Sequence, residues 1–240
     1  MGANDFAAFA LFIACWLAYQ PLLGLLSKRG GAVINTDMTV IRAAWMRNMV
    51  SRENRFMDGQ LLGHALNSAS FFASSNLLLI AATAGALFGG EATFRSVSAL
   101  EVIQTSSRLL FELQLALVIA TLARGLLDFI WSIRQMNYCI AAVGAVPEGL
   151  TPEETQAYGE TVSRMLNPAL SSFNAGVRGY YFALAAGAWL FGPAAFAVAT
   201  LGAVVLLLWR QRRSPMASAI GDLRRLIESK PGRTPDAPSS

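Results

Sequence analysis

The stretch YYFALAAGAWLFGPAAFAVATLGAVVLLLW, Tyr180 to Trp209, decides how this chain folds. It contains no charged residue and is about thirty residues long, whereas one helix needs roughly twenty residues to cross a bilayer. Gly192-Pro193 lies near its middle, and such a pair commonly ends one helix and begins the next. The stretch is therefore either one long, tilted helix or a hairpin of two short helices.

The composition of the whole chain places these helices in a membrane. Of 240 residues, 54% are hydrophobic and only 14% are charged, whereas charged residues make up about a quarter of a soluble protein. Three more apolar regions, residues 6–26, 64–88 and 109–130, are each long enough for one span. We therefore predict an all-α, polytopic transmembrane helical bundle.

The basic residues decide between the two forms of the last region, because cytoplasmic loops accumulate Lys and Arg. With one span there, nine of the nineteen basic residues lie on the wrong side of the membrane; with a hairpin, seventeen share one side. We therefore predict about five helices, the last two forming a hairpin over residues 174–191 and 193–209. The N-terminus is then outside and the C-terminus inside, in a membrane of the bacterial inner (cytoplasmic) type. A single span kinked at Pro193 stays open as the alternative, since membrane helices tolerate proline.

Other segments are predicted to flank these spans within one membrane domain, residues 1–230. Asp37 to Asp58 has apolar residues at helical spacing with arginines between them, which predicts an amphipathic helix on or dipping into the inner interface. Thr151 and Glu154 form a capping-box pattern for another helix. A short amphipathic helix follows Ser214-Pro215, with one apolar side made by Met216, Ala219, Ile220, Leu223 and Ile227. Residues 231–240 are predicted to be a disordered tail.

The composition also argues against several classes of function. A single histidine, His64, and two cysteines, Cys15 and Cys139, do not provide the ligand sets of common metal sites or a disulfide framework. We therefore expect no metal or cofactor. The basic residues lie beside apolar spans rather than among stacking aromatic residues, so we expect anionic lipid at the cytoplasmic face and no nucleic acid.

The stretch SRENRFMDGQ, Ser51 to Gln60, is the most polar part of the chain near a span, and we call it the collar. If the preceding helix continues through it, Arg55 and Asp58 form an i,i+3 ion pair. One interpretation is an interfacial ring whose arginines contact lipid phosphates. The other is an anion-recognising mouth or docking surface, because arginine binds carboxylate and phosphate with a fixed fork. The candidate residues are Arg52, Glu53, Asn54, Arg55, Asp58 and Gln60.

Residue types within the spans add further candidates. His64, Asn67, Ser68 and Ser75 fall roughly on one side of the second span, where they either pack against other helices or line a wet path. Glu112 lies within the third span, and membrane-embedded ionisable groups are functional candidates by default. It also lies four residues after Arg108, so local neutralisation is the alternative. A proton or cation relay that uses Glu112 and His64 is a further hypothesis.

Several of these motifs resemble those of a known family. They are Trp45, Arg52-Glu53-Asn54-Arg55, Asp58-Gly59-Gln60, the run from Asn67 to Ser74, and Trp189-Leu190-Phe191-Gly192-Pro193. Over about residues 5 to 225 the chain resembles the membrane family catalogued as domain of unknown function 599. The resemblance implies an integral membrane protein, and it supplies no substrate, cofactor or catalytic residue.

Three functions remain open from the sequence. The leading one is a non-enzymatic accessory or scaffold subunit of a membrane complex, with a protein partner or a second copy bound within the membrane. The alternative is a homo-oligomeric small channel or transporter lined by the second and third helices. The third is a membrane-embedded, lipid-modifying enzyme that uses Asp58, His64 or Glu112 as an acid or base.

Overall fold

The computed structural model describes residues 2–28, 34–100, 103–105 and 107–229, and within them every regular element is a helix. The predicted all-α fold class is therefore confirmed. The elements in chain order are α1 (Ala3–Lys28), α2 (Ile34–Val50), α3 (Phe56–Phe88), α4 (Gly90–Ser98), α5 (Arg108–Gly144), α6 (Pro152–Gly187), the 3-10 helix η1 (Ala188–Phe191), α7 (Pro193–Arg212) and α8 (Pro215–Ser229). The tail predicted to be disordered, residues 231–240, lies outside the described residues.

Four helical segments are long and apolar enough to cross a membrane: Ala3–Leu25, Phe56–Phe88, Arg108–Gly144 and Pro193–Ser229. The protein is therefore an integral membrane protein. α6 is not among these four, because polar residues occur along its whole length, including Asn174 and Arg178 in its second half. It packs against α5, α2 and α7, and a helix so surrounded by protein does not need an apolar surface on every side.

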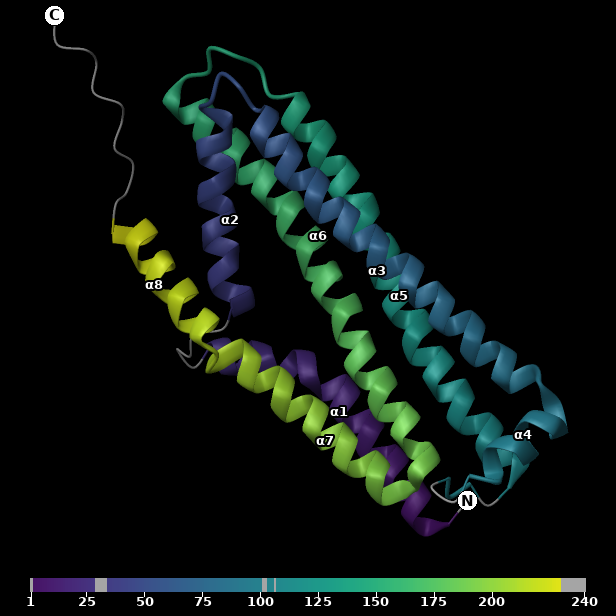
Figure 1. The fold of residues 1–240 in the computed structure, drawn as a ribbon. Coiled ribbons are helices and arrows are strands. Elements are labelled where there is room, and N and C mark those ends of the chain that lie inside the picture. Colours follow the sequence, from purple (N-terminus) through teal and green to yellow (C-terminus); the bar gives the residue numbers. More distant parts are fainter. Residues whose placement is uncertain (1, 29–33, 101–102, 106, 230–240) are drawn as a thin grey trace, which may run out of the picture.

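The predicted hairpin is present at Gly192-Pro193. η1 continues α6 to Phe191, and α7 begins at Pro193 and runs back in the opposite direction beside α1 (Figure 1). Gly192 connects them with φ 102°, a backbone conformation that glycine adopts readily. The alternative of a single kinked span is therefore wrong.

The helices run between two ends of the molecule, which we name by the segments found there. The hairpin end holds the Gly192-Pro193 turn, the start of α1 and the start of α5; the collar end holds the collar and the α5–α6 connection (Figure 1). α5 has 37 residues and α6 has 36. At about 1.5 Å per residue each is about 55 Å long, well beyond a hydrocarbon core about 30 Å thick. Both helices therefore project past the membrane.

The predicted amphipathic helix over Asp37 to Asp58 forms as α2, which ends earlier, at Val50. Its apolar side is covered by protein: Met46, Met49 and Val50 are buried in one cluster with Cys139 of α5 and Leu166 of α6. In Figure 1 α2 lies alongside the first half of α6 rather than across the end of the bundle. Its amphipathic pattern therefore serves helix packing.

α8 attaches to α2. Arg224 forms an ion pair with the buried carboxylate of Asp37 at 2.8 Å, and Ala217 is buried in the contact. On the predicted apolar side, Ile220 and Ile227 are partly buried, whereas Met216 and Leu223 are exposed. The helix is present as predicted, but its covered side includes a charged residue that the pattern did not mark.

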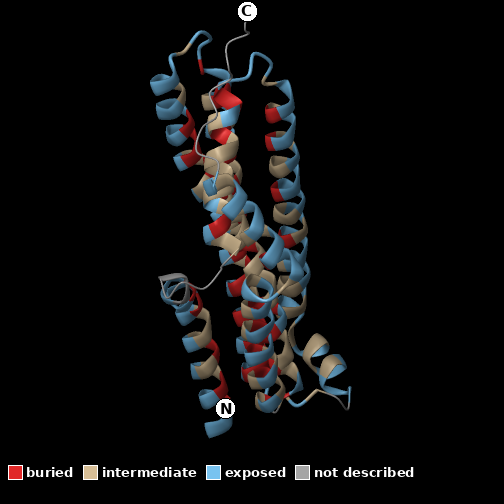
Figure 2. Ribbon diagram, turned by 90° about the vertical axis from the view of Figure 1, so that its left-hand side faces the viewer, coloured by how far each residue is buried: buried red, intermediate tan, exposed pale blue. Residues whose placement is uncertain are grey.

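Buried residues lie on the sides of the helices that face one another, and much of the remaining helix surface is exposed (Figure 2). One cluster near the hairpin end joins α1, α6, η1 and α7 through Phe12, Phe182, Trp189 and Phe196. A second cluster near the collar end joins α2, α3, α5 and α6. The predicted capping box also forms, with the Thr151 side chain accepting from the backbone of Glu154 and the Glu154 side chain accepting in return.

Candidate functional site

The collar contains a buried carboxylate held by two donors. Because α2 ends at Val50 and α3 begins at Phe56, the connecting segment lets Arg52 fold over the first turn of α3. Its Nη1 lies 2.5 Å from Oδ1 of Asp58, and the indole Nε1 of Trp45 donates to the same oxygen at 2.7 Å. Asp58 is fully buried, whereas the Arg52 side chain is 46% exposed. The Trp45 hydrogen bond therefore joins α2 to α3, and the Arg52 ion pair joins the segment between them to the first turn of α3.

This geometry corrects the expected ion pair between Arg55 and Asp58. The expectation assumed a continuous helix through the collar, and the helix is interrupted there. Arg55 instead donates to three backbone carbonyls, those of Val50, Val146 and Pro147. These carbonyls lie at or just beyond the C-terminal ends of α2 and α5, where the helix dipoles favour a cation. Arg55 therefore ties the two ends together.

The other collar residues lie at the surface. Asn54 accepts a hydrogen bond at 2.9 Å from the backbone of Phe56, the first residue of α3. Glu53 and Gln60 are exposed. A cavity of about 370 Å³ beside them is lined by Arg52, Glu53, Arg55 and Glu148, among others. Both arginines are already engaged by the protein, and two carboxylates share the cavity. This favours a structural role over an anion-recognising mouth.

The polar side chains of α3 point in two directions: some face α5 and others face outward. Asn76 is buried and donates to the carbonyl of Leu122 on α5 at 3.0 Å. His64 and Asn67 are exposed, as is Phe71 on the same side of the helix. The predicted polar face is therefore not covered by any helix that the structure describes.

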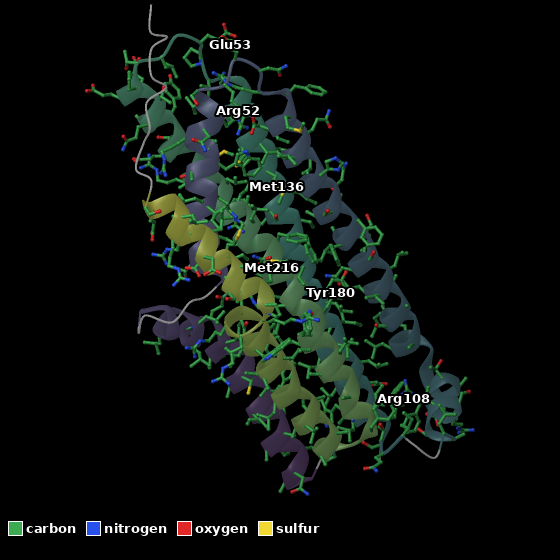
Figure 3. The ribbon with its side chains drawn as sticks, turned by 60° about the vertical axis from the view of Figure 1, so that its left-hand side comes forward. Arg52, Glu53, Arg108, Met136, Tyr180 and Met216 are labelled. Atoms are coloured by element: carbon green, nitrogen blue, oxygen red, sulfur yellow. The ribbon has the colours of Figure 1, made fainter. Side chains whose placement is uncertain are left out.

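Glu112 lies at the other end of the molecule from the collar; Figure 3 shows its partner Arg108 there, far from Arg52 and Glu53. Oε1 of Glu112 accepts from Arg108 at 2.8 Å, and Glu91 of α4 lies 3.8 Å from the same arginine. Since α3 and α5 are antiparallel, His64 and Glu112 are about 30 Å apart along the bundle. This separation argues against a direct relay between them.

Two features of the structure were not foreseen in the sequence. At the hairpin end, Trp189 donates to the carboxylate of Asp5 at 3.0 Å, and Gln114 donates to the Trp189 carbonyl at 3.0 Å. Between α1, α5 and α6, a groove brings Arg124 and Arg178 together. The available signal was the same in both cases, namely polar residues placed within apolar runs.

Among the residues that the structure describes, no three His, Cys, Asp or Glu side chains gather where they could hold a metal ion. The polar groups of the collar instead bond to one another and to the backbone.

Comparison with known proteins identifies a family. Neither a curated protein nor a solved structure matches the chain. Residues 7–216 match the family described as "Protein of unknown function, DUF599". That match covers most of the chain, so this integral membrane protein belongs to the DUF599 family.

Proposed function

We propose that the protein is a non-enzymatic accessory or scaffold subunit of a membrane complex, which binds its partner through the exposed side of α3. The observation that carries the proposal is that few residues of this helix are covered by the rest of the protein. In the most apolar window of α3, 6% of the residues are buried, against 39% for α5. Of the described helices, α3 packs chiefly against α5, with a small contact to α4.

The chemistry of this bare side fits another helix better than lipid. Ser70 and Ser74 are exposed along its membrane part, and His64 and Asn67 are exposed next to it on the collar side. Polar side chains in a membrane find hydrogen-bond partners on neighbouring helices. Small residues allow two helices to approach closely. A Cβ added at Gly63 would meet nothing within 4 Å, so the surface of α3 is open there. The partner that fits is therefore a membrane helix with small and hydrogen-bonding residues.

The collar supports this role by fixing the start of α3. The Trp45 hydrogen bond holds that start to α2, the Arg52–Asp58 ion pair holds it to the preceding segment, and Arg55 holds this segment to the end of α5. A docking helix anchored in this way loses little conformational entropy when it binds.

The orientation is part of the proposal. With the N-terminus outside and the C-terminus inside, the collar end faces the cytoplasm of a bacterial inner membrane, and the order of spans in the sequence assigns seventeen of the nineteen basic residues to the cytoplasmic side. Anionic lipid headgroups then surround the arginines at that boundary.

Native mass spectrometry of the complex extracted in mild detergent tests the proposal. The wild-type protein should appear with a different protein at fixed stoichiometry, and Asn67→Leu with Ser74→Leu should remove that partner. Asn137→Leu, a matched change at an exposed position of α5, should retain it. A uniform homo-oligomer without other proteins would contradict the proposal and favour the channel alternative. A monomer that binds nothing would overturn both.

A further inference from the structure

A groove of about 360 Å³ lies between α1, α5 and α6, away from the collar and from the exposed side of α3. α6 forms its floor, and α1 and α5 form its walls. Leu17, at its edge, is 69% exposed, so the groove opens toward the surrounding lipid. The polar residues that line it are Tyr19 and Gln20 of α1, Thr121, Arg124 and Asp128 of α5, and Arg178 of α6; the hydroxyl of Thr121 is bonded to the carbonyl of Leu117 within its own helix.

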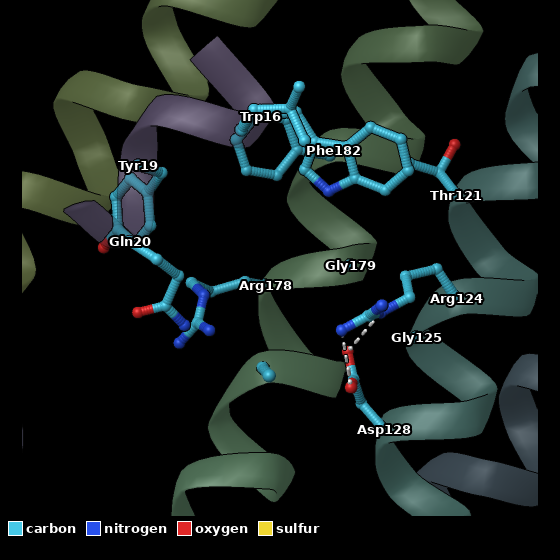
Figure 4. A pocket seen from close by; sticks show the side chains of 12 residues that line it. Trp16, Tyr19, Gln20, Thr121, Arg124, Gly125, Asp128, Arg178, Gly179 and Phe182 are labelled. Carbon is cyan, nitrogen blue, oxygen red and sulfur yellow. Dashed lines mark hydrogen bonds and ion pairs between the residues drawn. The ribbon is translucent and has the colours of Figure 1, made fainter. Parts of the chain in front are cut away.

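The groove is polar at one end and apolar at the other. α1 and α5 run from the hairpin end toward the collar end, and α6 runs in the opposite direction. Trp16, Thr121 and Phe182 therefore lie toward the hairpin end, whereas Arg124, Asp128 and Arg178 lie toward the collar end, as Figure 4 shows. This arrangement matches an amphiphile with its chains toward the middle of the membrane.

The depth of the charged end agrees with a headgroup. Arg124 lies about 24 Å along α5 from its start at Arg108, and Arg178 lies about 20 Å along the helix from the hairpin turn. With the hairpin turn at one boundary of a hydrocarbon core about 30 Å thick, both arginines come close to the opposite boundary. Long basic side chains reach the headgroups from such a position.

The groove also has a positive charge that the described protein does not neutralise. Arg124 is paired with Asp128 at 3.3 Å. The guanidinium of Arg178 lies over the ring of Tyr19, 5.6 Å from its centroid, and within the described residues it has no ion pair or hydrogen bond. The Tyr19 hydroxyl is buried and likewise has no hydrogen-bond partner among them. Unused donors at a buried site carry a desolvation cost unless something pairs with them.

We propose that this groove binds one anionic phospholipid, with its phosphate on Arg178 and Arg124 and its chains along Trp16, Leu17 and Phe182. The guanidinium fork suits a phosphate better than any other group at this depth. The apolar end of the groove distinguishes a lipid phosphate from a free one. The site does not depend on the partner proposed for α3, so either proposal can fail without the other.

The test measures lipid retention by native mass spectrometry after reconstitution in vesicles. The vesicles contain phosphatidylcholine alone or equal parts of phosphatidylcholine and phosphatidylglycerol. The wild-type protein should retain one phosphatidylglycerol. Arg178→Ala should weaken this retention about tenfold or more, since a hydrogen-bonded charge is lost, and Arg178→Lys should restore part of it. Arg134→Ala, which removes an exposed arginine outside the groove, should retain the lipid as the wild type does.

Two further arms keep the test decisive. Arg124→Ala removes the second proposed phosphate ligand, whose side chain is 64% exposed, and should lower retention even if Arg178→Ala fails to fold. Thermal stability in lipid-free detergent checks that the Arg124 variant is folded. Inorganic phosphate should neither displace the lipid nor stabilise the protein. Equal stabilisation by inorganic phosphate would overturn the lipid in favour of a free anion. Equal retention by the wild type and the Arg124 and Arg178 variants would overturn the site itself.

Discussion

The two ends of the molecule use the same bond in different surroundings. At each end a tryptophan indole donates to a buried aspartate: Trp45 to Asp58 at the collar end and Trp189 to Asp5 at the hairpin end. Asp58 also has a cation, Arg52, at 2.5 Å. Asp5 has, within the described chain, only neutral donors, the second being the backbone of Gly2 at 2.9 Å.

The surroundings of the two tryptophans differ as well. Trp189 is 1% exposed and stacks on Phe196, with 4.9 Å between the ring centroids. Trp45 is only partly buried. Both ends have an apolar cluster, but the aspartates differ: Asp5 is held by a tryptophan packed among aromatic residues far apart in the chain, whereas Asp58 is held also by a cation close to it in the chain.

Removing each tryptophan should give the largest contrast between the ends. Trp189→Ala should lower the free energy of unfolding by about 3–5 kcal/mol, because it leaves a cavity and an unpaired carboxylate. Trp45→Ala should cost about 2 kcal/mol, because less surface is buried and Asp58 keeps its arginine. Thermal unfolding in detergent measures both. Equal losses would show that the aromatic cluster adds little at the hairpin end.

Two glycines with positive φ allow the backbone strain at the two ends of the molecule to be compared. Gly192→Ala at the hairpin end places an alanine at φ 102° and ψ 167°, a backbone region essentially confined to glycine, and should cost about 2–3 kcal/mol. Gly149→Ala at the collar end has φ 71° and open space, so about 1–2 kcal/mol is expected. The same unfolding measurement compares the two. A Gly149 variant as unstable as the Gly192 variant would contradict this account.

Replacing each aspartate by asparagine isolates the charge. Asp58→Asn loses its ion pair and should cost about 1–2 kcal/mol, a modest value because Arg52 is half exposed to solvent. Asp5→Asn keeps an acceptor for Trp189 and has no cation to lose, so less than about 1 kcal/mol is expected. Added salt screens the ion pair, so it should reduce the difference in the free energy of unfolding between Asp58→Asn and the wild type. If salt does not change this difference in unfolding free energy, the charge of Arg52 does not contribute to stability.

The smallest effect concerns pH at the collar end. Hydrogen bonds from the backbone and hydroxyl of Thr151 lower the pKa of Glu154 below its ordinary value of 4.5. Because the folded pKa is lowered, this contribution to stability is present above the unfolded pKa and is lost as the pH falls through the folded pKa. The melting temperature of the wild type should therefore fall slightly more steeply with decreasing pH than that of Glu154→Gln. Identical pH profiles would mean that the capping box adds nothing measurable.

The sequence could predict those features that depend on local pattern or on summed charge. The hairpin at Gly192-Pro193 followed from the distribution of basic residues, and the capping box at Thr151 followed from spacing alone. The partners of Asp58 could not be predicted, because they depend on where α2 stops, which is decided by its packing on α5 and α6. For the same reason the surroundings of Arg178 could not be predicted. Its groove exists because three helices distant in the chain meet there.

The continuous length of α5 and α6 has a consequence for reach. With the hairpin turn at one boundary of the hydrocarbon core, their excess over its thickness raises the collar roughly 25 Å above the other boundary. Since both helices are unbroken from one end to the other, the number of their residues sets the distance between the membrane and the collar. A protein that contacts the collar must therefore extend its own contact surface to that height, and one confined to the headgroup layer will meet only the sides of the bundle.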